Sequence, residues 1–281
     1  MKKIVLFTVA SLIAFIFACE KDLQPLKSKQ KVDVTKFNYI GEMHNEALKF
    51  VLENTTQLPT NKEIPEHVHR LVKEFLPRDY SIFENNRKQM SEEVELMITA
   101  QKKVNAFEYI KTLKISKELK HLLNQMMNTI NQGMPLNSLQ EELSKLENSG
   151  IQTLNDGELT ILLSSTSVAK YSAKFWYPAS LGGEGGIKYL KIQPKQSFGD
   201  YDYGVETDPE ETLEERRIRL NWAKIIGVDA ISVVGAAAMS IVESGGASAI
   251  PNPLLGGMPT AGAIGLIGGA LGSASEVISQ W

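Results

Sequence analysis

Two stretches near the C-terminus decide the fold: IIGVDAISVVGAAAMSIVES at 225–244 and AGAIGLIGGALGSASEVIS at 261–279. Each has about twenty mostly apolar residues without proline, and a segment containing glycine and proline separates them. This pattern predicts two apolar helices joined by a turn. Between residues 225 and 281 there is no Lys or Arg, and the acids are Asp229, Glu243 and Glu276.

Small side chains repeat at intervals of four residues in both stretches. This spacing puts them on one face of a helix and lets two helix backbones approach closely. A glycine inside a helix costs about 1 kcal/mol relative to alanine, so this many glycines imply tight packing that offsets the loss. The positions expected to pack the hairpin are Asp229, Ser232, Ala236, Ser240, Gly265, Gly268, Gly269, Gly272 and Ser273.

The repeat resembles the glycine-zipper segments of membrane-active peptides such as two-peptide bacteriocins, and this resemblance implies a packing mode. Each predicted helix is long enough to cross a bilayer. An ionised Asp229 near the bilayer centre would cost about 2.5–3.5 kcal/mol, however. Two alternatives stay open at this point: a membrane-active protein that inserts the hairpin, and a hairpin buried in a helical core with Asp229 hydrogen-bonded to a small neighbour such as Ser273.

Upstream of the hairpin, residues 36–176 show apolar side chains at helical spacing and almost no alternating strand pattern. Capping-box spacing at Asn105–Glu108 and Ser138–Glu141 predicts helix starts, and Pro65 suits a first helical turn. Gly133 and Gly150 are expected to end helices, and the last helix of this region is expected over 155–176. A further helix start is predicted at 208–211, an Asp-Pro-Glu-Glu sequence. The predicted fold is an all-α, multi-helix bundle with a C-terminal Gly/Ala-rich hairpin.

His44 is the strongest candidate for chemistry because it lies on the apolar stripe of the first predicted helix, near Glu42 and Glu46. A partly buried histidine beside carboxylates can serve as a general base. We favour the alternative, a hydrogen-bonded core residue. The surrounding sequence, 39–48, resembles a segment near the start of envelope lipoproteins, and that resemblance implies no activity. Nucleophile, phosphate-loop and dinucleotide motifs are absent from the sequence.

His67 and His69 are the other histidines weighed, as ligands of a metal together with Asp79. Two residues apart on a helix, their side chains point in opposite directions, whereas a helical chelate needs a spacing of four. We therefore expect no metal and no cofactor.

Residues 177–207 form a predicted connector that is rich in glycine and aromatic side chains. Aromatic rings offer contact area for a sugar, peptide or protein partner, and they also pin long loops to a protein body. The ring positions considered for a binding surface are Trp176, Tyr177, Tyr189, Tyr201 and Tyr203.

The N-terminus has the pattern of an export signal: two lysines, a fifteen-residue apolar run over 4–18, and then Cys19, the single cysteine of the chain. An apolar run, a small residue and a cysteine resemble the lipobox of bacterial lipoproteins. The resemblance implies cleavage before Cys19, its lipidation, and attachment to a membrane. The Glu20-Lys21-Asp22 sequence directly after the cysteine resembles the surface-export signal of Bacteroidota lipoproteins, which favours the outer membrane or cell surface.

The complete expectation has five segments: signal peptide 1–18, lipidated cysteine and tether 19–35, helical domain 36–176, connector 177–207, and a helix with the zipper hairpin at 208–281. A formal net charge of −3 argues against nucleic acid as a partner, and a single cysteine excludes an internal disulfide. The favoured function is a lipid-anchored binding or structural module of the cell envelope, with a protein or a second copy as partner. The alternatives are a membrane-active protein and a lipid-anchored hydrolase using His44; enzyme activity is the less favoured class.

Overall fold

The computed structural model describes residues 33–60, 62–76, 106–190, 222–243 and 260–280. The chain divides into two compact units, Met1–Asp33 and Val34–Trp281, and the elements described below belong to the second. Within the described residues there are eight α-helices, three short 3-10 helices and no strand. The prediction of an all-α protein is therefore confirmed.

The first two α-helices follow the sequence pattern closely. After the 3-10 turn η1 (Val34–Phe37) come α2 (Asn38–Asn54) and α3 (Ile64–Phe75), and Pro65 lies in the first turn of α3. The apolar stripe of α2, from Ile40 to Val51, is fully buried. His44 is buried with it, as its position on the stripe indicated.

The middle of the chain forms four α-helices with distinct caps. They are α6 (Ala106–Thr112), α7 (Lys117–Asn131), α8 (Leu136–Thr153) and α9 (Asp156–Trp176). The side chains of Ser116 and Asn155 accept hydrogen bonds from backbone N–H groups at the starts of α7 and α9, which is the usual role of these residue types at an N-cap.

Two predictions about α8 are wrong. The helix begins at Leu136, directly after Pro135, so Ser138 lies inside it and does not cap it. Gly150 does not end the helix, which continues to Thr153. A Cβ atom added at Gly150 would come within 2.3 Å of Leu162 on α9, so this glycine allows two helices to approach closely.

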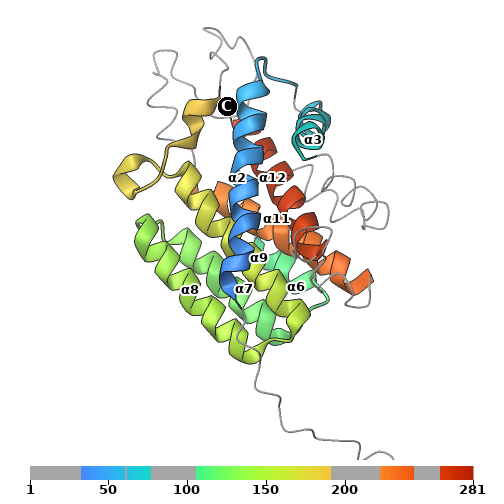
Figure 1. Cartoon of the computed structure of the whole chain (residues 1–281), viewed down its shortest axis with the longest axis vertical. Helices are drawn as coiled ribbons and strands as arrows, with labels where there is room; N and C mark the ends of the chain where they lie inside the picture. The colour runs from blue at the N-terminus through green and yellow to red at the C-terminus, as the bar shows by residue number, and fades with distance from the viewer. Residues whose placement is uncertain (1–32, 61, 77–105, 191–221, 244–259, 281) are drawn as a thin grey trace, which may run out of the picture. The chain divides into compact units, whose positions relative to one another are not determined.

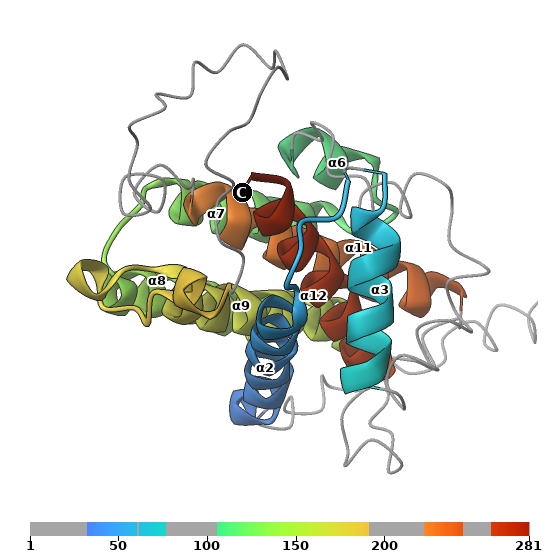
Figure 2. The same ribbon diagram turned by 90° about the horizontal axis from the view of Figure 1, so that it is seen from above.

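The C-terminal hairpin consists of α11 (Trp222–Glu243) and α12 (Thr260–Gln280), which pack against each other. In Figures 1 and 2, α12 lies among α2, α3, α9 and α11, and it contacts all four. Every side chain from Ala261 to Ile278 is buried. The hairpin and the helices of residues 36–176 therefore lie in one compact unit, and the buried residues of the hairpin belong to the core of that unit.

Glycines of α12 bring the two hairpin helices together. A Cβ atom at Gly268 would lie 2.9 Å from the Ala236 Cβ atom, and one at Gly272 would lie 2.6 Å from the Ser232 hydroxyl oxygen. A Cβ atom at Gly265 would come within 2.9 Å of Val233. Side chains larger than hydrogen would separate the helices at each of these positions.

Several predicted features lie outside the described residues. They are Cys19 and residues 20–32 of its tether, the Asn105 cap, Asp79, Tyr201, Tyr203 and the helix start at 208–211.

A buried polar cluster as the candidate functional site

Four helices bring polar side chains together in the core of the bundle. His44 comes from α2, Ser172 and Trp176 from α9, Asp229 from α11 and Ser273 from α12, and all five are fully buried. Burying this many polar groups is costly unless they are paired, so the cluster is the most distinctive chemical feature of the described residues.

The Asp229 carboxyl group is the centre of the cluster. The Ser172 hydroxyl donates a hydrogen bond to Asp229 Oδ2, and His44 Nε2 lies 3.8 Å from the same oxygen. Trp176 Nε1–H donates to the Ser273 hydroxyl over 3.2 Å. Ser273, a small neighbour expected for Asp229, is among its hydrogen-bonding neighbours, and Ser172 is another.

Burial governs the charge state of both ionisable groups. It raises the pKa of Asp229 well above its ordinary value, against the opposing influence of the Ser172, Ser273 and Trp176 donors. It also lowers the pKa of His44 to about 4, against opposing contributions from Asn45 and the Gly269 backbone. Both shifts disfavour the charged form of the residue, as desolvation does.

Gly269 makes room for the histidine ring. A Cβ atom at this position would lie 3.0 Å from His44 Cδ2 and 3.0 Å from Val233 Cγ2, so the absence of a side chain lets α2 and α11 meet on the surface of α12. Gly269 therefore differs from Gly265, Gly268 and Gly272, whose nearest neighbours lie on α11.

The remaining hairpin positions named in the sequence analysis are also buried. Ser232, Ala236 and Ser240 lie on α11, and at most 1 % of any of them is exposed. Together with Asp229, Ser273 and the four glycines they form the interior of the hairpin and its contacts with α2 and α9.

The acids beside His44 in the sequence do not join it. Glu42 and Glu46 are exposed, and Glu42 accepts a hydrogen bond from the Tyr171 hydroxyl over 2.8 Å. The carboxyl group near the His44 ring comes instead from Asp229, 185 positions later in the chain. A general-base site made of His44, Glu42 and Glu46 is therefore not what the structure shows.

Two of the aromatic residues considered for a binding surface are buried. Trp176 is fully buried and stacks on Trp222, and 1 % of Tyr177 is exposed. This corrects the expectation for these two rings, because they pack into the helical body and cannot offer contact area to a partner. Tyr189, at the end of η3 (Gly186–Tyr189), is half-buried and stacks on Phe175. A second 3-10 turn, η2 (Ala179–Leu181), precedes it.

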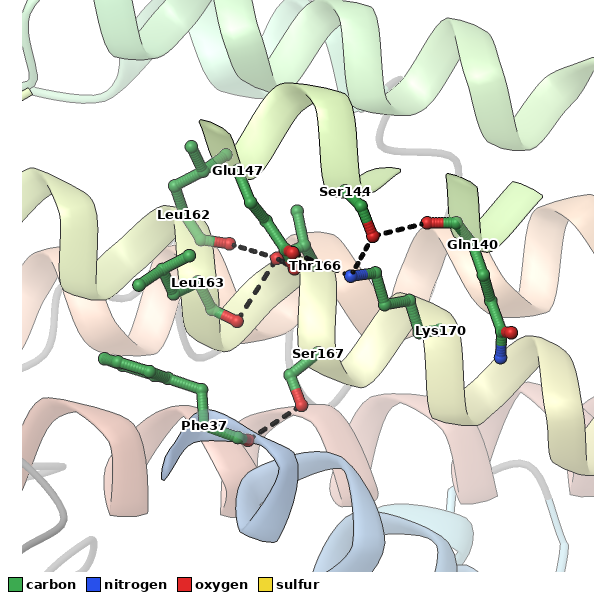
Figure 3. A network of polar contacts seen from close by, with 9 residues as sticks. All are labelled: Phe37, Gln140, Ser144, Glu147, Leu162, Leu163, Thr166, Ser167 and Lys170. Carbon is green, nitrogen blue, oxygen red and sulfur yellow. Dashed lines mark hydrogen bonds and ion pairs between the residues drawn. The ribbon is translucent and has the colours of Figure 1, made fainter. Parts of the chain in front are cut away.

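A second polar network lies between α8 and α9 (Figure 3). Lys170 Nζ donates to Glu147 Oε2 over 2.7 Å and to the Ser144 hydroxyl over 2.9 Å, while the Thr166 hydroxyl donates to Glu147 Oε1 over 2.7 Å. Each charged group has a partner and the groups are mostly shielded from water, which indicates a role in joining the two helices.

His67 and His69 separate as their spacing predicted. His67 is half-buried, and its Nε2 atom lies 3.0 Å from the Thr55 hydroxyl, while His69 faces the interior. No group of three or more His, Cys, Asp or Glu side chains with metal-binding geometry occurs among the described residues.

Sequence reasoning missed Ser172 and the inward role of Trp176. The signal for them was present in α9, where Ser165 and Ser172 are seven residues, or about two turns, apart and so share a face. Ser165 donates to the Ala230 carbonyl of α11 over 2.9 Å, and Ser172 donates to Asp229 on the same helix. The small hydroxyl side chains of Ser165 and Ser172 thus lie on the face of α9 that meets α11.

No family model, curated protein or solved structure matches the chain. The functional argument therefore depends on the residues themselves.

Proposed function

We propose that the protein is a lipid-anchored protein of the cell envelope whose helical bundle acts as a binding or structural module. The N-terminal pattern supports attachment through Cys19, and acyl chains on that residue would hold the chain firmly, since each buried CH₂ contributes about 0.8 kcal/mol. The acidic residues after Cys19 support a position at the outer membrane or cell surface.

Burial of the C-terminal hairpin is the observation that carries this proposal. Ala261–Ile278 is the one described segment long and apolar enough to cross a membrane, and all of it is packed inside the bundle. With that segment buried against protein, the N-terminal pattern is the feature that supports attachment to a membrane. A membrane-active role would require the hairpin to leave the contacts with α2, α3 and α9.

The geometry also favours a module over a hydrolase. The exposed fraction of His44, Ser172 and Asp229 is zero, so a substrate would reach them only after the helices had separated. A catalytic base must approach its substrate to hydrogen-bond distance.

The experiment compares three chains in cells supplied with a labelled palmitate. The wild type should carry the label and sediment with membranes. Cys19→Ser should lose the label. The matched control combines Cys19→Ser with Ser28→Cys, which moves the cysteine nine positions along the chain from residue 19, and it should stay unlabelled.

Labelling of Cys19→Ser at the wild-type level would contradict the proposal, because the acyl chain would then be attached at another residue. Leakage of liposomes caused by the Cys19→Ser protein at micromolar concentration would favour the membrane-active alternative instead.

A further inference from the structure

A chain of hydrogen bonds through one histidine connects helix α3 to the end of α2. The Thr55 hydroxyl, at the C-cap of α2, donates to the Val51 carbonyl over 2.7 Å. His67 of α3 has its Nε2 atom 3.0 Å from the same hydroxyl oxygen, and Arg70 Nη2 donates to His67 Nδ1 over 3.4 Å. Each nitrogen of the His67 ring therefore has a polar partner, one at the end of α2 and one on α3.

These partners fix the position of the hydrogen on the His67 ring. A guanidinium group can only donate, so Nδ1 accepts and carries no hydrogen. A neutral ring then has its hydrogen on Nε2. The Thr55 hydroxyl oxygen accepts it, because the single hydrogen of that hydroxyl is directed at the Val51 carbonyl. The donors and acceptors therefore match at every atom of the chain, and they match only for the neutral ring.

A second hydrogen on the His67 ring is incompatible with this arrangement. It binds at Nδ1 and makes that atom a donor that faces the donors of Arg70. It also places a positive charge on a half-buried ring beside a guanidinium group. A charged ring is more stable in water, and turning toward water takes Nε2 away from Thr55. Burial and the charge of Arg70 both lower the pKa of His67, as this geometry requires.

The charged groups around the ring offer no carboxylate to a charged His67. Arg70 is the charged group that acts on His67, and its Nη1 atom lies 4.0 Å from Glu74 Oε2. Glu63, one turn before His67 on α3, accepts hydrogen bonds from the backbone N–H and the hydroxyl of Thr60. Among the residues that the structure describes, no acid forms an ion pair with His67.

The position of α3 makes this connection consequential, because α3 packs against both α2 and α12. Its Phe75 ring stacks on Phe50 of α2 with 5.1 Å between the ring centroids. The charged residue of α12 is Glu276, which is paired with Lys224 of α11 at 2.5 Å. Without the connection through His67, α3 would keep its apolar contacts and lose the hydrogen bond to the end of α2.

We propose that His67 is a pH-sensitive joint between α2 and α3. As a neutral ring with its hydrogen on Nε2 it ties the two helices together, and binding of a proton at Nδ1 loosens α3 from the bundle. The joint is a property of the bundle, and it does not depend on lipidation of Cys19 or on the function proposed above.

The direction of the pH dependence follows from the neutral state. The pKa of His67 is lower in the folded chain than in the unfolded chain. The stability that His67 contributes is therefore fully present above the pKa of an unfolded histidine, about 6.5, and it is lost as pH falls below that value. We expect α3 to be attached most firmly at neutral and alkaline pH and to loosen in acid.

The experiment is amide hydrogen exchange of the full chain at pH 7.5 and pH 5, with the intrinsic pH dependence of exchange divided out. In the wild type, protection of α3 should fall relative to that of α9 as pH drops, by up to about tenfold per pH unit for one proton. His67→Gln should abolish this fall, because the Gln amide has a donor and an acceptor and does not titrate. His121→Gln, which replaces an exposed histidine of α7, is the matched control and should keep it.

A second measurement needs no variant. Nitrogen NMR of the wild type with labelled histidine should show a neutral His67 ring at pH 7 with its hydrogen on Nε2, and the ring should become charged at a lower pH than in the urea-unfolded chain. A hydrogen on Nδ1 at pH 7, or a ring that becomes charged at a higher pH than in the unfolded chain, would overturn the proposal. So would α3 protection that never departs from that of α9, or a fall of equal size in His67→Gln.

Discussion

Single residues in this bundle matter mainly through what they allow their neighbours to do. Gly269 leaves room for the His44 ring, and Ser172 supplies a donor to Asp229. Asp229 was identifiable in the sequence as one of three acids in a stretch, 225–281, that has no Lys or Arg. Its partner was not identifiable, because His44 lies 185 positions away and nothing local in the sequence connects the two helices.

Replacing Gly268 by alanine should destabilise the protein by about 2 kcal/mol, because the new methyl group would lie 2.9 Å from Ala236 Cβ and 3.1 Å from the Ser232 carbonyl oxygen, and the second of these is backbone. Gly227→Ala in α11 is the matched control: its methyl group would meet only the terminal methyl of Met127, at 2.8 Å, which a flexible side chain can move away. Urea unfolding of both variants provides the comparison. Equal stability of the two would show that the hairpin tolerates separation at Gly268.

At the level of helices, local signals predicted where elements lie and tertiary packing decided where they end. The stripe from Leu119 to Ile130 is the buried face of α7, and Asn155 caps α9. The predictions made from Gly150 and Ser138 were wrong. Glycine occurs both where a helix ends and where two helices approach closely, and capping-box spacing also occurs inside a helix. Gly150 lies inside α8 where Leu162 of α9 approaches it, and α8 begins directly after Pro135 rather than at Ser138. The sequence pattern alone does not indicate either fact.

The joint between α8 and α9 should depend strongly on its shielded ion pair. Lys170→Met leaves Glu147 without its cation, and breaking such a pair costs about 3 kcal/mol. Lys145→Met is the control on α8, because the ammonium group of Lys145 is exposed near Glu141 and Glu142 and its loss should destabilise the protein far less than the loss of Lys170. Thermal or urea unfolding measures the stability of both variants. Adding Glu147→Gln to Lys170→Met should recover part of the loss, and a Lys170→Met protein as stable as Lys145→Met would contradict this account.

At the scale of the whole molecule, composition left two descriptions of the C-terminal hairpin equally open. Length and apolar character suit a membrane span and a core helix alike, so the decision rests on what surrounds the helices. In the folded unit α12 is enclosed by α2, α3, α9 and α11, and Asp229 and Ser273 of the hairpin accept hydrogen bonds from Ser172 and Trp176 of α9. The all-α fold class and the C-terminal hairpin were therefore predictable from the sequence. The helices that enclose the hairpin could be identified only from the tertiary structure.

The central claim is that the glycine-rich hairpin lies in the core of the bundle. Amide hydrogen exchange, measured residue by residue along α12, tests this claim most directly. In detergent-free Cys19→Ser protein, amides of residues 261–278 should be among the slowest to exchange, at the rate of global unfolding, with and without lipid vesicles, because their helix is enclosed by protein. Rapid exchange of these amides in solution, with protection appearing only after vesicles are added, would contradict the claim.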